Sequence, residues 1–566
     1  MIIIPPPSFK TLRYLRLAFA LTMMCGFADW YPYAAAQSLP RVEVSFPASV
    51  HAQPITGRLL AVFTRDGKSE PRFQIGRALT TPPVFAIDVE QLLPGDSAAI
   101  DEHALGLPLA SLASLPAGDY FVQALLNVYT EVHRSDGHTL WVHLDQWEGQ
   151  DLSRSPGNLY STVRKVHIDS AATLSLKLAL TEVIPPVKVP ADTEWVKNVK
   201  IQSKLLTRFW GCPIYVGATI LLPKGYAEHP GVRYPVVYYQ DHFRLGAPFG
   251  FRTTPSSDQG ERHGYRFYQA WTAADFPRLI VVTFQHPTPY SDDSYAVNSA
   301  NNGPYGDALM TELVPYLEEH FQLSRQPYAR VLTGLSTGGW EALALQVYHP
   351  GFFGGAWVFC PDPVDFRRYT VANVYEDENA FYEPGHEWVR PIRYIHRLPD
   401  GQPQDTAREY SLNDAVLGSH DRSAGQLATW EAVYAPVGED GYPKPVWDKL
   451  TGVIDHSVAL SMRDHGYDLR YYIEGHWPQI GPALVGKLHF YCGDMDGVYL
   501  NLAVYLLEDF LKSTKHPFYA GSFEYGRPMK GHGWMPMSYP ELVRIMADYI
   551  ARHSPPTEGT QAWHYQ

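Results

Sequence analysis

Apolar and polar residues alternate in short runs along the first third of the chain. Four strand-length segments show this pattern: Val42–Phe46, Arg58–Phe63, Tyr120–Leu126 and Thr173–Leu178. Turn-forming residues separate them, as in Arg65-Asp66-Gly67. Short alternating runs between turns are typical of antiparallel β-sheets. We therefore predict an all-β, immunoglobulin-like sandwich over residues 37–184.

The pattern changes after a proline-rich segment at residues 185–199, which we predict to be a linker. Continuous apolar runs at Tyr234–Gln240 and Leu279–Phe284 predict buried strands. Apolar residues spaced by four predict an amphipathic helix over Tyr305–Phe321. Strands that alternate with helices favour a mostly parallel sheet with helices on both faces. We predict an α/β catalytic domain over residues 200–566, with its site at the carboxyl ends of the strands.

This alternation stops between about residues 366 and 482, where Tyr, Trp, His and charged residues are frequent. Such a long insertion at the edge of a sheet serves either as a lid or substrate platform, or as an extension packed on the first domain. Trp430 and Trp447 offer flat apolar faces to a sugar ring or an aromatic acyl group. Either tryptophan alternatively belongs to the core.

The segment Gly334-Leu335-Ser336-Thr337-Gly338 joins a predicted strand to a predicted helix. Gly-x-Ser-x-Gly in this context describes a nucleophile elbow, a turn so tight that its flanking residues must be nearly free of side chains. The Ser336 hydroxyl then stands above the sheet, where the first helix amides, including that of Thr337, face a developing oxyanion. The alternative is a Gly-rich turn in which serine caps a helix.

A serine nucleophile needs a histidine base and a carboxylate, which follow the serine in this order in such folds: acid, then histidine. Asp496 follows the apolar run Lys487–Cys492 and is our choice of acid, with Asp494 as the alternative. His532 lies between two glycines after the last predicted strand and is our choice of base. We expect the second oxyanion amide from Phe243, in the loop after the first buried strand.

The N-terminus predicts a secretory signal peptide over residues 1–36. Lys10, Arg13 and Arg16 precede an apolar run, and Ala34–Ala36 offers a cleavage site. We therefore expect a secreted or periplasmic protein, with no membrane span in the mature chain. The net charge of −13 argues against nucleic acid as a partner, because phosphate binding needs a basic face.

Cys212, Cys360 and Cys492 would remain after signal removal. Three cysteines at this spacing form neither a disulfide framework nor a zinc site, and we predict no metal and no cofactor. Cys360 and Cys492 end apolar runs, which favours buried, unreactive thiols, although one bridge stays open.

Several motifs together resemble the putative-esterase branch of the α/β-hydrolases, which includes feruloyl, acetyl xylan and enterochelin esterases, S-formylglutathione hydrolases and mycolyltransferases. They are Tyr234–Tyr238, Asn302–Leu309, Gly334–Gly339, His349–Ala356 and Gly531–Trp534. The resemblance spans about Lys200 to Ile550 and implies Ser336, Asp496 and His532 as a triad. The chain departs from the branch at Asp241-His242-Phe243, where relatives usually carry His-Gly or Asp-Gly.

From these observations we expect a secreted serine esterase that works through an acyl-enzyme and needs no cofactor. Secretion and the high aromatic content make a plant-polysaccharide ester the first substrate to test. The alternatives are an acyltransferase or peptidase on the same scaffold, or a non-catalytic protein that binds a glycan or a partner. The sequence leaves the oligomeric state open.

Overall fold

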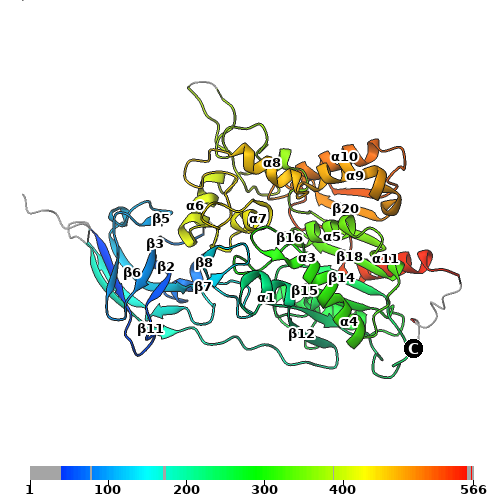
Figure 1. Cartoon of the computed structure of the whole chain (residues 1–566), viewed down its shortest axis with the longest axis horizontal. Helices are drawn as coiled ribbons and strands as arrows, with labels where there is room; N and C mark the ends of the chain where they lie inside the picture. The colour runs from blue at the N-terminus through cyan, green and yellow to red at the C-terminus, as the bar shows by residue number, and fades with distance from the viewer. Residues whose placement is uncertain (1–39, 77–79, 170–173, 386–387, 557–562, 564–566) are drawn as a thin grey trace, which may run out of the picture. The chain divides into compact units, whose positions relative to one another are not determined.

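The structure is a computed structural model that describes residues 40–76, 80–169, 174–385, 388–556 and 563. The predicted signal peptide at 1–36 lies outside these residues. From Leu39 onward the chain forms one compact unit. Figure 1 shows the two sheets of this unit, the first in blue and cyan and the second mainly in green and orange.

The first sheet has nine strands, which all come from the region predicted to be a sandwich. Its order is β4 (Ser97–Ile100), β1 (Arg41–Ser45), β11 (Ser175–Val183), β9 (Leu159–Ser161), β6 (Gly118–Val128), β2 (Ile55–Thr64), β3 (Val84–Leu92) and β5 (Leu105–Leu107), and β10 (Arg164–Ile168) also pairs with β6. All pairs are antiparallel except β1 with β11. The short 3₁₀ helices η1 (Pro71–Gln74) and η2 (Leu112–Ser114) and the hairpin β7 (Thr130–His133) and β8 (Thr139–Val142) complete this part.

Strand β2 is buried along its whole length, because its two faces meet two different apolar clusters. Leu59, Ala61 and Phe63 pack among side chains of the first sheet. Leu60 and Val62 face the other way, and their cluster includes Val416 and Leu417 from the insertion. Successive side chains of a strand point to opposite faces, so the continuous apolar run of β2 reflects burial on both sides.

The second sheet has eight strands in the order β12 (Val196–Gln202), β13 (Tyr215–Leu221), β15 (Ile280–Gln285), β14 (Val236–Gln240), β18 (Arg330–Leu335), β19 (Gly355–Phe359), β20 (Leu488–Gly493) and β21 (Ser522–Gly526). Only β12, β13 and β15 pair antiparallel; from β15 through β14 to β21 all pairs are parallel. The predicted mostly parallel sheet is therefore present. The parallel strands, from β15 and β14 to β21, end at one edge, and the predicted site residues follow the ends of β14, β18, β20 and β21.

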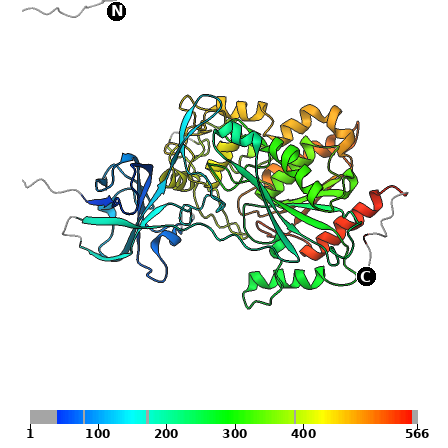
Figure 2. The same ribbon diagram turned by 60° about the horizontal axis from the view of Figure 1, so that its bottom comes forward.

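Helices cover both faces of this sheet. Helices α1 (Lys204–Trp210), α3 (Tyr305–Ala308), α4 (Val314–His320), α5 (Thr337–Tyr348), α9 (Leu469–Leu484) and α10 (Asn501–Ser513) share a core with Tyr238 of β14. Helices α2 (Gln259–Trp271) and α11 (Tyr539–His553) share another with Val237 and Tyr239. Figure 2 shows α11, in red, beside the green strands.

The π-helical turn η4 (Leu309–Leu313) joins α3 to α4, so the predicted helix over Tyr305–Phe321 is confirmed to within one residue. The short 3₁₀ helices η3 (Pro248–Gly250) and η5 (Pro327–Ala329) lie in connecting loops.

The insertion between β19 and β20 contains η6 (Phe366–Arg368), α6 (Ala407–Leu417), α7 (Gln426–Tyr434), α8 (His456–Asp464) and α9. Arg58 of β2 donates to the carbonyls of Ala415 and Val416 at 2.9 Å, which ties the last turn of α6 to the first sheet. A cation at the carbonyl end of a helix also suits its dipole. Part of the insertion is thus an extension packed on the first sheet.

Two tryptophans of the insertion, Trp430 and Trp447, belong to the core. Trp430 and Trp447 are only 1% and 3% exposed, so the structure favours the core alternative for both, although Trp430 also lines a pocket. The indole nitrogen of Trp447 donates to the hydroxyl of Ser411 at 3.0 Å. Both side chains are large and apolar, and sequence alone gave equal support to burial and to ligand contact.

Candidate active site

Ser336 is the single residue between strand β18 and helix α5, and its backbone angles are φ 58° and ψ −121°. Few residues other than glycine adopt a positive φ, and such strain is typical of a nucleophile elbow. A Cβ atom on Gly338 would lie 2.1 Å from the carbonyl oxygen of Gln240. On Gly334 it would lie 2.1 Å from the carbonyl oxygen of Gly338. Close backbone approach therefore explains both glycines of the motif.

The structure brings Asp496 and His532 together. Nδ1 of His532 lies 2.8 Å from Oδ2 of Asp496, which is fully buried. The other oxygen of Asp496 accepts from the amides of Val498 and Leu500 at 2.9 and 3.2 Å. Asp494, the alternative acid, instead accepts from the amide of Lys530 at 3.1 Å.

Ser336 and His532 line one pocket of about 560 Å³ at the carboxyl edge of the second sheet. Burial lowers the pKa of His532, but the hydrogen bond that His532 donates to Asp496 and the charge of that carboxylate outweigh burial and raise the pKa to about 9. The imidazolium form is therefore well stabilised here, as a base that receives a proton during reaction requires.

An unpredicted carboxylate lies beside the serine. The hydroxyl of Ser336 donates to Oδ1 of Asp362 at 3.3 Å. Asp362 follows the end of β19, as the other site residues follow their strands, and this position was the available signal for it in the sequence. It is missing from the predicted site because a Ser-His-Asp triad has no role for a second carboxylate.

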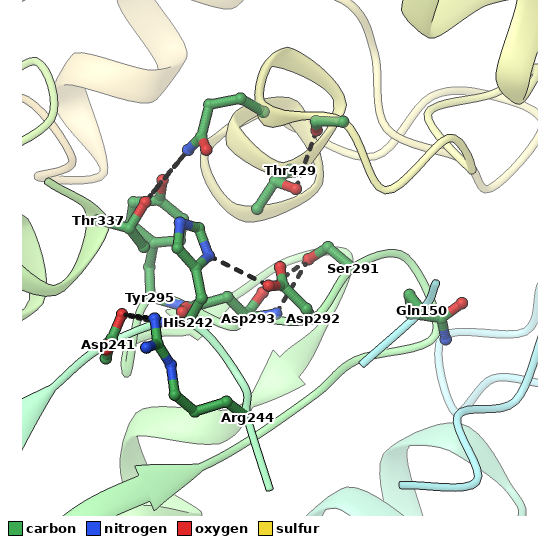
Figure 3. Close-up of polar contacts among 12 residues, drawn as sticks. Gln150, Asp241, His242, Arg244, Ser291, Asp292, Asp293, Tyr295, Thr337 and Thr429 are labelled. Carbon is green, nitrogen blue, oxygen red and sulfur yellow. Dashed lines mark hydrogen bonds and ion pairs between the residues drawn. The ribbon is translucent and has the colours of Figure 1, made fainter. Parts of the chain in front are cut away.

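The loop after β14 carries further polar groups of the pocket, Asp241, His242 and Arg244 (Figure 3). The amide of His242 donates to Oδ1 of its neighbour Asp241 at 3.0 Å, so it is already engaged. The next amide is that of Phe243, the predicted oxyanion donor, and the ring of Phe243 packs edge-on against Trp147. Arg244 reaches back to Asp241 at 2.7 Å.

The side chain of His242 points toward Asp292, with 3.1 Å between Nδ1 and Oδ2 (Figure 3). Burial lowers the pKa of His242, but the charges of Asp292 and Asp293 and the hydrogen bond to the Asp292 carboxylate raise it to about 10. An imidazolium thus lines the pocket at the first position of the loop that follows Asp241.

Among the described residues, two groups of side chains come close enough together to suggest a metal. In the first, His286 with Asp293 and Glu341, Nδ1 of His286 accepts the amide hydrogen of Ser294 at 3.1 Å. Its Nε2 must then carry the ring proton and has no lone pair for a metal. The second group is Cys360, Cys492 and Asp496, and the carboxylate of Asp496 is fully engaged by His532 and two amides. Neither group fits a metal ion.

Cys360 and Cys492 are fully buried and Cys212 is half-buried, and none of these three cysteines forms a disulfide. The predicted burial of the first two thiols is confirmed. No described helix is both long and apolar enough to cross a membrane.

Residues 212–440 match the family model described as putative esterase. The chain is a carboxylic ester hydrolase. The motifs that resemble the putative-esterase branch, and the α/β-hydrolase fold they imply, agree with this match. No curated protein matches the chain.

Three solved structures illustrate what the chain is similar to. A ferulic acid esterase is 16% identical, with a TM-score of 0.32, over 63% of this chain and 98% of that one. An S-formylglutathione hydrolase from Staphylococcus aureus is 13% identical, with a TM-score of 0.32, over 63% and 99%. A ferulic acid esterase from Anaeromyces mucronatus is 14% identical, with a TM-score of 0.28, over 65% and 97%.

Proposed function

We propose that the esterase works through a Ser336–His532–Asp496 triad and a covalent acyl-enzyme. The observation that carries the proposal is the 2.8 Å contact between His532 and Asp496 in a pocket that also contains the elbow serine. The Ser336 hydroxyl attacks the ester carbonyl carbon, and its proton passes to Nε2 of His532. Asp496 fixes the proton on Nδ1 and stabilises the imidazolium that forms.

The negative charge that develops on the carbonyl oxygen needs donors. The amide of Thr337 is the first of helix α5, where the helix dipole favours an anion. We assign the second donor to the amide of Phe243, because that of His242 is engaged by Asp241. His532 then protonates the departing alcohol. A water gives a proton to His532 and attacks the acyl carbon, and His532 returns that proton to the oxygen of Ser336 as the acid leaves.

The natural substrate, the location of the protein and its division into domains are further parts of the proposal. The N-terminal signal pattern supports export, and we propose an acyl group linked to a polysaccharide as the ester. We propose that residues 37–184 form an immunoglobulin-like β-sandwich domain, joined by a linker at 185–199 to the catalytic domain at 200–566. The insertion at 366–482 contributes residues such as Tyr410 and Trp430 to the pocket wall, which supports a role in substrate choice.

The experiment is a hydrolysis panel with the mature protein and its Ser336→Ala variant. Acetylated and feruloylated oligosaccharides and 4-nitrophenyl esters of short acids serve as substrates. The wild type should turn over at least the activated aryl esters, and the variant should keep only residual activity from binding and oxyanion stabilisation. A variant that retains most of the wild-type rate would show that Ser336 is not the nucleophile. Transfer of the acyl group to an added alcohol in preference to water would indicate an acyltransferase.

A further inference from the structure

The Asp362 carboxylate is held rigidly beside the nucleophile. It is 2% exposed. Its Oδ2 accepts four hydrogen bonds, from Tyr295 Oη at 2.5 Å, Thr337 Oγ1 at 2.9 Å, Gln426 Nε2 at 3.1 Å and Trp430 Nε1 at 3.1 Å. Four donors on one oxygen fix the plane of the carboxylate, so its other oxygen has a defined direction. Gln426 and Trp430 belong to α7, so the insertion helps to build this arrangement.

The second oxygen, Oδ1, faces the pocket. Within the part of the chain that the structure describes, its hydrogen-bond partner is the Ser336 hydroxyl, at 3.3 Å. That bond is long for two oxygens, which usually lie 2.5–3.0 Å apart. It also ends when the reaction begins, because Ser336 loses its proton to His532 as it attacks. For as long as the acyl-enzyme exists, the oxygen of Ser336 is part of an ester and has no proton to donate.

A buried carboxylate oxygen without a donor is costly. The other carboxylates that line the pocket have a basic partner: Asp241 pairs with Arg244 at 2.7 Å, and Asp405 with His396 at 3.0 Å. Among the described residues no basic side chain forms an ion pair with Asp362 within 4.0 Å; its charge acts on His242 and His532 at longer range, where it helps to raise the pKa of both rings. The oxyanion of the tetrahedral intermediate adds a second negative charge close by, and two like charges repel.

We propose that Asp362 Oδ1 binds a protonated amine carried by the substrate, within a few bonds of the scissile carbonyl. This substrate class rests on the proposed serine esterase function and narrows it to esters with a cationic nitrogen. The N–H group replaces the hydrogen bond that Ser336 gives up, and its charge offsets Asp362 while the oxyanion forms. Asp362 is thus a substrate-binding residue, oriented by Tyr295, Thr337, Gln426 and Trp430.

Two pairs of esters with the same shape test the proposal. On the acyl side, methyl N,N-dimethylglycinate carries an amine where methyl isovalerate carries a carbon. On the alcohol side, 2-(dimethylamino)ethyl acetate and 3-methylbutyl acetate differ in the same way. Hydrolysis is followed by pH-stat near neutral pH, where the amines are at least partly protonated. The quantity of interest is the ratio of kcat/KM between amine and carbon ester within one pair.

Asp362→Asn is a conservative test variant. The asparagine oxygen can take the place of Oδ2 and keep the four donors satisfied, which turns its NH₂ group toward Ser336 and the pocket. Asp405→Asn is the matched control, because it removes a carboxylate of the same pocket that has a histidine partner. The wild-type ratio in at least one pair should fall by about ten- to hundredfold in Asp362→Asn, the range for a hydrogen bond to a charged group. Asp405→Asn should leave the ratio within about twofold, because the Asp405 carboxylate is paired with His396 at 3.0 Å and is not offered to a substrate amine.

Three results would overturn the proposal. In the first, the wild-type enzyme has a higher kcat/KM on the carbon ester than on the amine ester in both pairs. This result is obtained without any variant, so it does not depend on whether a variant folds. In the second, Asp362→Asn melts like the wild type and keeps its ratios. In the third, the variant slows amine and carbon esters equally and shifts the pH profile, as expected if Asp362 acted only through His532. Absence of hydrolysis of every ester, carbon esters included, would instead contradict the esterase mechanism itself.

Discussion

Replacing Asp496 by asparagine is the sharpest test of the acid. The asparagine can keep its carbonyl oxygen on the amides of Val498 and Leu500, which now bind Oδ1 at 2.9 and 3.2 Å. Its NH₂ group then faces Nδ1 of His532, where a carboxylate oxygen lies at 2.8 Å. A donor at this position forces the ring proton onto Nε2, which is the wrong tautomer for accepting a proton from Ser336.

The size of the loss follows from the pKa of His532. The rise from 6.5 to about 9 is equivalent to about 3 kcal/mol of preferential stabilisation of the imidazolium. The hydrogen bond and charge of Asp496 are the main sources of that rise. Losing about 3 kcal/mol in the transition state slows kcat by about two orders of magnitude, and the wrong tautomer brings the expected loss to about three or four.

The assay is kcat on an activated aryl ester at fixed pH, with Asp494→Asn as the matched control. Asp494 lies two residues away and accepts from the amide of Lys530, not from His532. Its variant should lose less than about tenfold, because removing one ordinary hydrogen bond costs about 1 kcal/mol. Equal losses in the two variants, or a larger loss in Asp494→Asn, would refute the assignment of the acid.

Three further predictions follow from the same geometry. Because hydrolysis needs neutral His532, whose pKa is raised to about 9, kcat/KM should increase from neutral pH up to about pH 9, and a profile already flat at pH 7 would contradict this. Gly338→Ala should abolish activity, because the added Cβ would lie 2.1 Å from a backbone oxygen. Gly351→Ala should match the wild type in activity and melting, because its added Cβ would have no neighbouring atom within 4 Å. Trp430→Ala and Trp447→Ala should each lower the free energy of unfolding by about 3–5 kcal/mol in denaturant titrations, because both side chains are buried; unchanged stability would disprove their place in the core.

The tight turn around Ser336 could be predicted from sequence because its requirements are local. A tight turn needs glycine at Gly334 and Gly338, and the strand before and helix after are visible in the apolar pattern. The order of serine, acid and histidine then restricted the remaining choice. Asp496 and His532 lie 2.8 Å apart in the structure, measured from Oδ2 to Nδ1.

The role of Asp362 could not be predicted, because it depends on contacts between distant segments. Its partner Gln426 lies 64 positions away and Tyr295 lies 67 positions away. The parallel pairing of β1 with β11 is equally hidden, since an alternating pattern shows which side chains are buried but not which strands are neighbours. Burial of Trp430 and Trp447 was undecided for the same reason.

Identification of the residue that carries the covalent intermediate tests the proposed mechanism most directly. A fluorophosphonate reacts with an activated serine, and peptide mass spectrometry locates the adduct. The mechanism predicts one adduct per chain, on Ser336, and no adduct in Ser336→Ala or after thermal unfolding. An adduct on another residue, or hydrolysis that continues with Ser336 fully modified, would contradict it.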